Sequence, residues 1–167
     1  MTLKGGTLTE RQRLAEIYEQ HADTVTRAAW QVTGSLHTAQ DCAEEAFLRL
    51  MKQEDMEESH VLPWLIRTAV NIAKNTLKAH EHSRTVPLDE LDNALTDDEL
   101  TLAERAAMRA MLSLDERYRL PLILHLVQGY TIIETARLIG KGMNTTASLI
   151  RRGRKLLQKA YEKEGFR

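Results

Sequence analysis

The chain has few of the features that mark secreted or membrane proteins. Its 167 residues include a single cysteine, Cys42, so no intrachain disulfide can form and nothing indicates an oxidising compartment. No apolar run approaches the roughly 20 residues that cross a bilayer, and the N-terminus lacks the apolar core of a signal peptide. We therefore expect a cytoplasmic protein that is not membrane-embedded and has its own hydrophobic core.

Signatures of catalytic and metal sites are also missing. There is no Walker-type glycine loop and no convincing Ser/His/Asp arrangement. The six histidines have no metal-ligand spacing, since His80 and His82 lie two residues apart without a Cys-x-x-Cys. Three carboxylates, Asp41, Glu44 and Glu45, share one helix without a partner for acid–base chemistry. We expect no enzymatic activity, cofactor, metal ion or small-molecule substrate.

Helical periodicity runs through the N-terminal half, and strand alternation is absent. Thr9 with Gln12 forms a capping box that predicts the start of a first helix, and Gly34 predicts its end. A second helix is predicted from about Thr38 to Lys52. The residues that we expect on its buried face are Ala39, Cys42, Ala43, Ala46, Phe47 and Leu50.

A third helix is predicted to follow a polar, acidic loop over residues 53–60. Pro63 is expected in the first turn of this helix, where its missing N–H leaves no hydrogen bond unmade. The neighbouring Trp64 is then expected to be a core residue.

The formal net charge of −1 hides an uneven distribution. Residues 62–79 and 144–161 contain basic residues and no acid, whereas residues 81–104 contain eight acids and one base, Arg84. Two basic helical blocks therefore flank an acidic connector. We predict an all-α fold with two small helical domains, residues 1–80 and 96–167, joined by an acidic linker at 81–95.

Capping residues predict the helices of the C-terminal half. Thr96 with Glu99 and Ser113 with Glu116 each match a capping box. Pro121 is expected to bend the helix that Ser113 starts, because its ring removes a backbone donor.

A helix-turn-helix is predicted over residues 131–159. Thr131 with Glu134 caps the first helix, Gly140 can end it in the left-handed conformation, and Asn144 can cap the second. Such a motif places its second helix in the major groove of DNA. The arginines of that helix, which have no interspersed acids, favour a surface that faces phosphates.

Two separated blocks resemble a bacterial RNA polymerase sigma factor of the extracytoplasmic-function (ECF) type. The first contains Asp41, Glu44, Glu45 and Phe47, followed by Trp64, Leu65, Arg67, Ala69 and Asn71. The second is similar to the C-terminal domain of that family and contains Gly129, Glu134, Ala136, Gly140, Thr145, Ser148, Arg152, Gly153, Arg154 and Leu157. The order and spacing of both blocks cover residues 15–160.

The resemblance implies a role for each block. Residues 1–80 would bind core RNA polymerase and promoter DNA at the minus-ten element, where the loop 53–60 would capture an unstacked base. Residues 96–167 would bind the minus-thirty-five element as a duplex, and an anti-sigma partner is implied. The implied polymerase-binding residues are Asp41, Glu44, Glu45 and Arg49. The implied minus-ten residues are His60, Arg67, Asn71, Lys74, Asn75 and Lys78. The implied minus-thirty-five residues are Asn144, Thr145, Thr146, Ser148, Arg151, Arg152, Arg154 and Lys155.

Two other functions fit parts of the sequence. A helix-turn-helix regulator without a polymerase role would use only the C-terminal domain and would favour palindromic sites. A sigma-like interaction protein with weakened DNA binding is suggested by the acidic loop 53–60 and by Ala147 and Leu149, which stand where Lys and Arg are common in the family.

Overall fold

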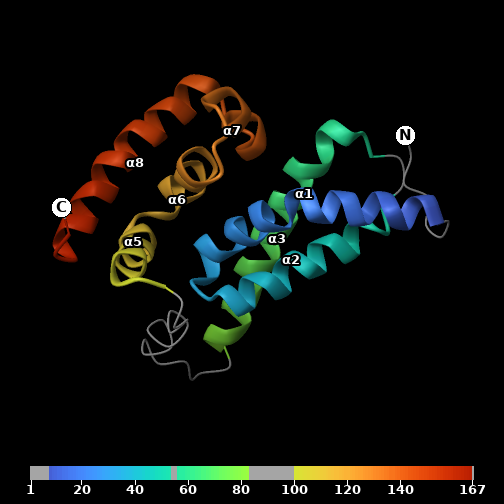
Figure 1. The fold of residues 1–167 in the computed structure, drawn as a ribbon, viewed down its shortest axis with the longest axis horizontal. Helices are drawn as coiled ribbons and strands as arrows, with labels where there is room; N and C mark the ends of the chain where they lie inside the picture. Colours follow the sequence, from blue (N-terminus) through green and yellow to red (C-terminus); the bar gives the residue numbers. More distant parts are fainter. Residues whose placement is uncertain (1–7, 54–55, 83–99, 167) are drawn as a thin grey trace. The chain divides into compact units, whose positions relative to one another are not determined.

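The computed structural model describes residues 8–53, 56–82 and 100–166. The chain divides into two compact units, Met1–Ala79 and His80–Arg167 (Figure 1). All regular elements in the described ranges are helical, which confirms the all-α prediction. Most of the linker 81–95, and the capping pair Thr96–Glu99, lie outside the described residues; residues 81 and 82 belong to the helix that precedes them.

The N-terminal unit contains α1 (Leu8–Thr33), α2 (Leu36–Leu50) and α3 (Glu58–His82). Gly34, at φ 67°, ends α1 as predicted, and Ser35 caps α2 by accepting a hydrogen bond from the N–H of Thr38. All six residues predicted for the inner face of α2 are buried. Helix α1 begins at Leu8, one residue before the predicted cap Thr9.

Helix α3 begins earlier than the sequence predicts. It starts at Glu58, so Pro63 lies inside the helix and not in its first turn. A proline there cannot donate to the carbonyl four residues earlier, and this cost is offset by tertiary packing. Val61, Leu65 and Ile66, on either side of Pro63, are fully or almost fully buried. An ion pair of 3.1 Å between Arg13 on α1 and Glu58 adds a contact at the start of α3.

The C-terminal unit contains α5 (Leu102–Ser113), α6 (Glu116–Leu122), a π-helical turn η1 (Ile123–Val127), α7 (Ile132–Ile139) and α8 (Met143–Lys163). Helix α6 is capped by Asp115, so the predicted capping role of Ser113 is wrong; Ser113 is the last residue of α5. The α-helical pattern changes to the wider π turn two residues after Pro121, consistent with its missing donor.

Helices α7 and α8 form the predicted helix-turn-helix. Thr131 and Glu134 make both hydrogen bonds of a capping box, and Gly140, at φ 68°, ends α7 in the left-handed conformation. The predicted cap Asn144 is wrong. Gly142 occupies the cap position of α8, because the carbonyl of Gly142 already accepts from the N–H of Thr146 at 3.0 Å.

Close packing of α8 on α6 depends on Gly153, which is buried. A Cβ at this position would lie 2.9 Å from Cδ1 of Leu122 and 3.3 Å from Cβ of Tyr118. Only a residue without a side chain allows this approach in the observed arrangement. Gly153 therefore sets how α8 is presented by the unit.

Candidate functional site

Helix α8 has a buried side and a basic side. Thr146, Ile150 and Gly153 are buried against the unit. Arg151, Arg152 and Lys155, which we call the α8 basic face, are exposed and follow the helical spacing i, i+1, i+4. In the described part of the chain no ion pair is recorded for these three residues. Their charge is available to an anion.

The other residues predicted for the minus-thirty-five element are placed differently. Asn144 and Thr145 are exposed in the first turn of α8, and Ser148 is half-buried. Arg154 is exposed but lies about 200° around the helix axis from Arg152, since each residue turns an α-helix by about 100°. It therefore lies across α8 from Arg152 but within about 60° of Arg151, three residues earlier.

Thr146 was predicted to contact the minus-thirty-five element, and the structure contradicts this prediction. Its side chain is 0% exposed, and its hydroxyl donates to the carbonyl of Gly142 at 2.9 Å. The prediction of a DNA contact through this side chain is wrong, because the side chain is buried in the unit and already hydrogen-bonded. Its position fixes the start of α8.

The first turn of α7 is also fixed electrostatically. Glu134 accepts from the backbone N–H of Thr131 at 2.8 Å and from its hydroxyl at 2.9 Å. These hydrogen bonds lower the pKa of Glu134 below its ordinary value of 4.5, because they stabilise the carboxylate form. The carboxylate also faces the positive end of the helix dipole.

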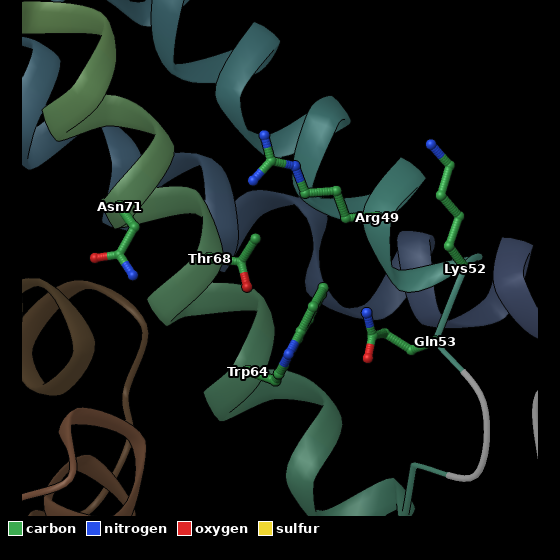
Figure 2. A pocket seen from close by; sticks show the side chains of 6 residues that line it. All are labelled: Arg49, Lys52, Gln53, Trp64, Thr68 and Asn71. Atoms are coloured by element: carbon green, nitrogen blue, oxygen red, sulfur yellow. The ribbon is translucent and has the colours of Figure 1, made fainter.

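A pocket of about 360 Å³ lies between the end of α2 and the first half of α3 in the N-terminal unit. We call it the α2–α3 pocket. Its lining residues are Arg49, Lys52, Gln53, Trp64, Thr68 and Asn71. Figure 2 shows Arg49, Lys52 and Gln53 on the α2 side and Trp64, Thr68 and Asn71 on α3. The α2–α3 pocket combines an aromatic ring, two cations and two amides, with no acid among its lining residues.

Along α3 the pocket continues into a polar and basic stripe. Trp64, Arg67, Asn71, Lys74 and Lys78 are spaced by three or four residues and therefore share one face of the helix, the α3 stripe. The exposed Asn75 flanks this face, and His60 lies on it in the first turn of α3, not in a loop. The structure thus brings together all six residues predicted for the minus-ten element.

Sequence reasoning missed part of this site. Trp64 was expected in the core, yet it is only partly buried and lines the pocket. Lys52 and Thr68 were not predicted to take part, whereas Gln53 begins the loop 53–60 that was predicted to capture a base. The signal for Trp64 was its spacing of three and seven residues from Arg67 and Asn71, which places the indole on their face.

The residues predicted to bind polymerase lie on the outer side of α2. Asp41 and Glu44 are exposed, and Glu45 accepts a hydrogen bond from Nε of Arg49 at 2.8 Å. His37 lies 3.7 Å from Asp41. Exposed pairs four residues apart on a helix contribute only about 0.3–0.5 kcal/mol, so this surface is easily rearranged. Arg49 differs from the other three because it also lines the pocket.

One histidine of the N-terminal unit has a perturbed environment. Nδ1 of His21 on α1 is buried and has no hydrogen-bond partner among the residues that the structure describes. Burial lowers the pKa of His21 below its ordinary value of 6.5, and the charge of Glu58 partly opposes this shift. His21 lies outside the contact surfaces described above.

Comparison with known proteins agrees with this arrangement. The model of Sigma-70 region 2 matches residues 17–83, and that of Sigma-70 region 4 matches residues 104–157. None of the described helices has the length and apolar character required to cross a membrane. The α3 stripe and the pocket fall within the first match, and the α8 basic face falls within the second.

Relatives support the same assignment. The ECF sigma factor SigE of Mycolicibacterium smegmatis is 28% identical over 152 residues, which are 86% of this chain and 59% of that protein. The chain thus spans about three-fifths of the length of that relative. The ECF sigma factor SigW of Bacillus subtilis is 22% identical over 167 residues, covering 90% of this chain and 89% of that protein.

A solved structure shares the fold. The sigma factor RpoE, crystallised with the anti-sigma factor NepR from Bartonella quintana, has a TM-score of 0.67 and 14% identity, covering 90% of this chain and 98% of that one. Two family models match the chain in the order of the two units, and ECF relatives match most of its length. Both comparisons give the same assignment. The chain belongs to the sigma-70 family of RNA polymerase sigma factors, in its ECF group.

Proposed function

We propose that the chain binds core RNA polymerase and directs it to a restricted set of promoters, with no reaction of its own. The observation that carries this proposal is the presence of two chemically different basic surfaces on one chain. The α2–α3 pocket suits a single strand, and the α8 basic face suits a duplex. A polymerase subunit that recognises a promoter and opens the DNA uses both kinds of surface. We propose that it acts in the cytoplasm.

The N-terminal unit is proposed to hold the non-template strand of the minus-ten element. Single-strand binding needs cations that track phosphates and a ring on which an unpaired base can stack. The indole of Trp64, the amide of Asn71 and the cation of Arg67 lie on one face of α3 and supply these groups. Asp41, Glu44, Glu45 and Arg49 on α2 are proposed to dock on polymerase.

The C-terminal unit is proposed to read the minus-thirty-five element as duplex DNA. Asn144, Thr145 and Ser148 lie near the start of α8, where a recognition helix reaches base edges. Arg151, Arg152 and Lys155 are proposed to contact phosphates, and Arg154 is proposed to contact them from the side of the helix across from Arg152. We further propose an anti-sigma partner, by analogy with the RpoE–NepR complex.

Footprinting of the chain with core polymerase tests the proposal against a helix-turn-helix regulator. We expect protection of two unlike elements that depends on polymerase. Two half-sites of a palindrome, protected without polymerase, would show a regulator.

A salt titration tests the duplex contacts. Arg152→Gln is expected to reduce the slope of log affinity against log salt by about 0.9, because one phosphate contact is lost. Lys163→Gln, near the other end of α8, is the matched control and should leave the slope unchanged. A wild-type slope near zero would favour a sigma-like interaction protein without DNA binding.

A further inference from the structure

Asn144 carries an exposed amide that the fold does not use. The sequence predicts this residue as the cap of α8, but Gly142 occupies the cap position and Asn144 lies in the first turn of the helix. Among the residues that the structure describes, none is recorded as a hydrogen-bond partner of its side chain. Both the donor and the acceptor of this amide are therefore available to a ligand.

The side of α8 on which Asn144 lies follows from the helical spacing. At about 100° per residue, Asn144 lies about 200° from Thr146 and about 180° from Gly153, which are both buried against the unit. Ser148 and Arg151 follow at i+4 and i+7 and therefore share its face. The amide thus lies on the side of α8 that is turned away from the unit, in line with Arg151 of the α8 basic face.

The neighbours of Asn144 in the next turn of α8 are small. Ala147 and Ser148, three and four residues later, do not extend as far as a lysine or an arginine. An asparagine side chain is short, so it reaches a base only if the helix comes close to the floor of the groove. Ala147, which stands where a lysine or arginine is common in the family, leaves room for this approach.

The chemistry of the amide distinguishes among the groups of duplex DNA. A phosphate offers only acceptors, and the α8 basic face supplies cations for it. In the major groove adenine presents an acceptor, N7, beside a donor, the N6 amino group, and an asparagine pairs with both at once. Residues in the first turns of a recognition helix are the ones that contact base edges.

We propose that Asn144 selects one adenine in the duplex bound by α8. Its Nδ2 donates to N7 of the base, and its Oδ1 accepts from the N6 amino group. This assignment rests on the proposed function and adds one base that the C-terminal unit recognises.

The test titrates the full chain, with core polymerase, with duplexes that contain the upstream of the two elements protected in the footprint. Each adenine of that element, on either strand, is replaced singly by 7-deazaadenine, which lacks the N7 acceptor and keeps its base pair. At one position the wild-type complex should bind about fivefold more weakly, because one hydrogen bond is lost. Equal binding of all these duplexes would overturn the proposal.

Two variants assign the effect to one side chain. Asn144→Ala should bind the unmodified and the modified duplex equally, because the partner of N7 is gone, and alanine preserves the helix. Gln158→Ala is the matched control. Gln158 carries an exposed amide on the same helix, hydrogen-bonded to Glu162 at 3.2 Å, and lies outside the proposed contact set. This variant should retain the wild-type difference between the two duplexes.

Asn144→Asp tests the same pairing by changing the base preference. A carboxylate has no donor for N7 of adenine but accepts from the amino group of cytosine. The ratio of affinities for adenine and cytosine at the sensitive position should be about fivefold or more in wild type and should be reversed in Asn144→Asp. Comparing this ratio within each variant cancels the general repulsion between the new carboxylate and phosphates.

The outcomes separate this assignment from the proposed function. A 7-deazaadenine effect that persists in Asn144→Ala, or an unchanged preference for adenine in Asn144→Asp, would overturn the role of Asn144 and leave the proposed function standing. If no duplex binds the chain even with polymerase, the proposed function fails as well.

Discussion

The two units present their proposed contact residues in different ways. In the C-terminal unit the proposed contacts lie along one helix, α8, whose basic face consists of Arg151, Arg152 and Lys155. In the N-terminal unit they come from two helices, and residues as far apart as Arg49 and Asn71 line one pocket. The first surface needs only a correctly oriented helix, whereas the second exists only when α2 and α3 are packed together.

This difference has a functional consequence. A single basic helix matches the regular, rigid major groove of a duplex. A composite pocket can surround a base that has left the stack, and its affinity then depends on tertiary packing. Changes to the packing of α8 and changes to the pocket should therefore affect separate measurements, which allows the comparison to be tested unit by unit.

The largest effect is expected from Gly153→Val. The added side chain must displace Leu122 and Tyr118, and overpacking of this kind costs about 1–3 kcal/mol of the free energy of unfolding. Gly153→Ala should cost less, because only the flexible end of Leu122 comes closer than 3.0 Å and alanine favours the helix. Both Trp residues, Trp30 and Trp64, lie in the N-terminal unit, so tryptophan fluorescence should report an unchanged transition there. A shifted tryptophan transition would show that the units are not independent.

Trp64→Ala, in the N-terminal unit, is expected to weaken the binding of single-stranded DNA and not that of duplex DNA. Loss of a stacking ring should weaken single-strand binding by about 1–3 kcal/mol, while duplex binding to the minus-thirty-five element is unchanged. Trp64→Phe keeps an aromatic face and should retain most of the affinity. Anisotropy titrations with both DNA forms give the answer. Equal losses of affinity for single-stranded and duplex DNA would contradict the assignment of the two DNA forms to separate units.

A smaller effect of opposite sign is expected at Thr135 in α7. This side chain is 0% exposed, and within the described ranges its hydroxyl has no hydrogen-bond partner. Thr135→Val replaces an unsatisfied buried hydroxyl by a methyl group of similar shape and should stabilise the C-terminal unit by about 1 kcal/mol. Thr131→Val, four residues earlier, removes the capping hydroxyl and should destabilise by about 0.5–2 kcal/mol. Urea unfolding followed by circular dichroism measures both, and a destabilising Thr135→Val would contradict the burial argument.

The two units should also differ in their response to acid. The folded pKa of His21 lies below 6.5, so the unfolded N-terminal unit binds more protons and stability falls as pH decreases from about 6.5. The pKa values of Glu104 and Glu134, lowered by their capping hydrogen bonds, lie below 4.5, so their contribution is complete above about 4.5 and is lost as pH falls through the folded values. As the pH is lowered, tryptophan fluorescence should therefore report a loss of stability of the N-terminal unit first. Circular dichroism should report loss of the C-terminal helices only at lower pH. His21→Gln should remove the early phase, and an unchanged early phase would contradict its assignment to His21.

Local chemistry made much of the fold predictable. The capping box of Thr131 and Glu134, the left-handed Gly140 and the buried face of α2 all follow from groups within one or two helical turns. Such features need no knowledge of tertiary structure. The exposed arginines of α8 follow from helical spacing in the same way.

The failures involve residues whose environment is tertiary. Helix α3 starts at Glu58, where Val61 and Leu65 are buried and Glu58 is paired with Arg13. The sequence preference of proline for the first turn of a helix gives no information about these tertiary contacts. Thr146 was predicted to reach DNA, although its side chain is buried in the unit and donates to the carbonyl of Gly142. The pocket was not predictable either, because Lys52 and Thr68 meet only when α2 packs near α3.

Transcription in a reconstituted reaction tests the central claim most directly. The purified chain is added to core RNA polymerase on DNA that the chain retains together with polymerase in cells. The account predicts transcripts that start at a fixed position, require the chain and are reduced by both Trp64→Ala and Arg152→Gln, since each surface contacts a separate promoter element. No promoter-dependent transcript, together with no binding of the chain to core polymerase, would contradict it.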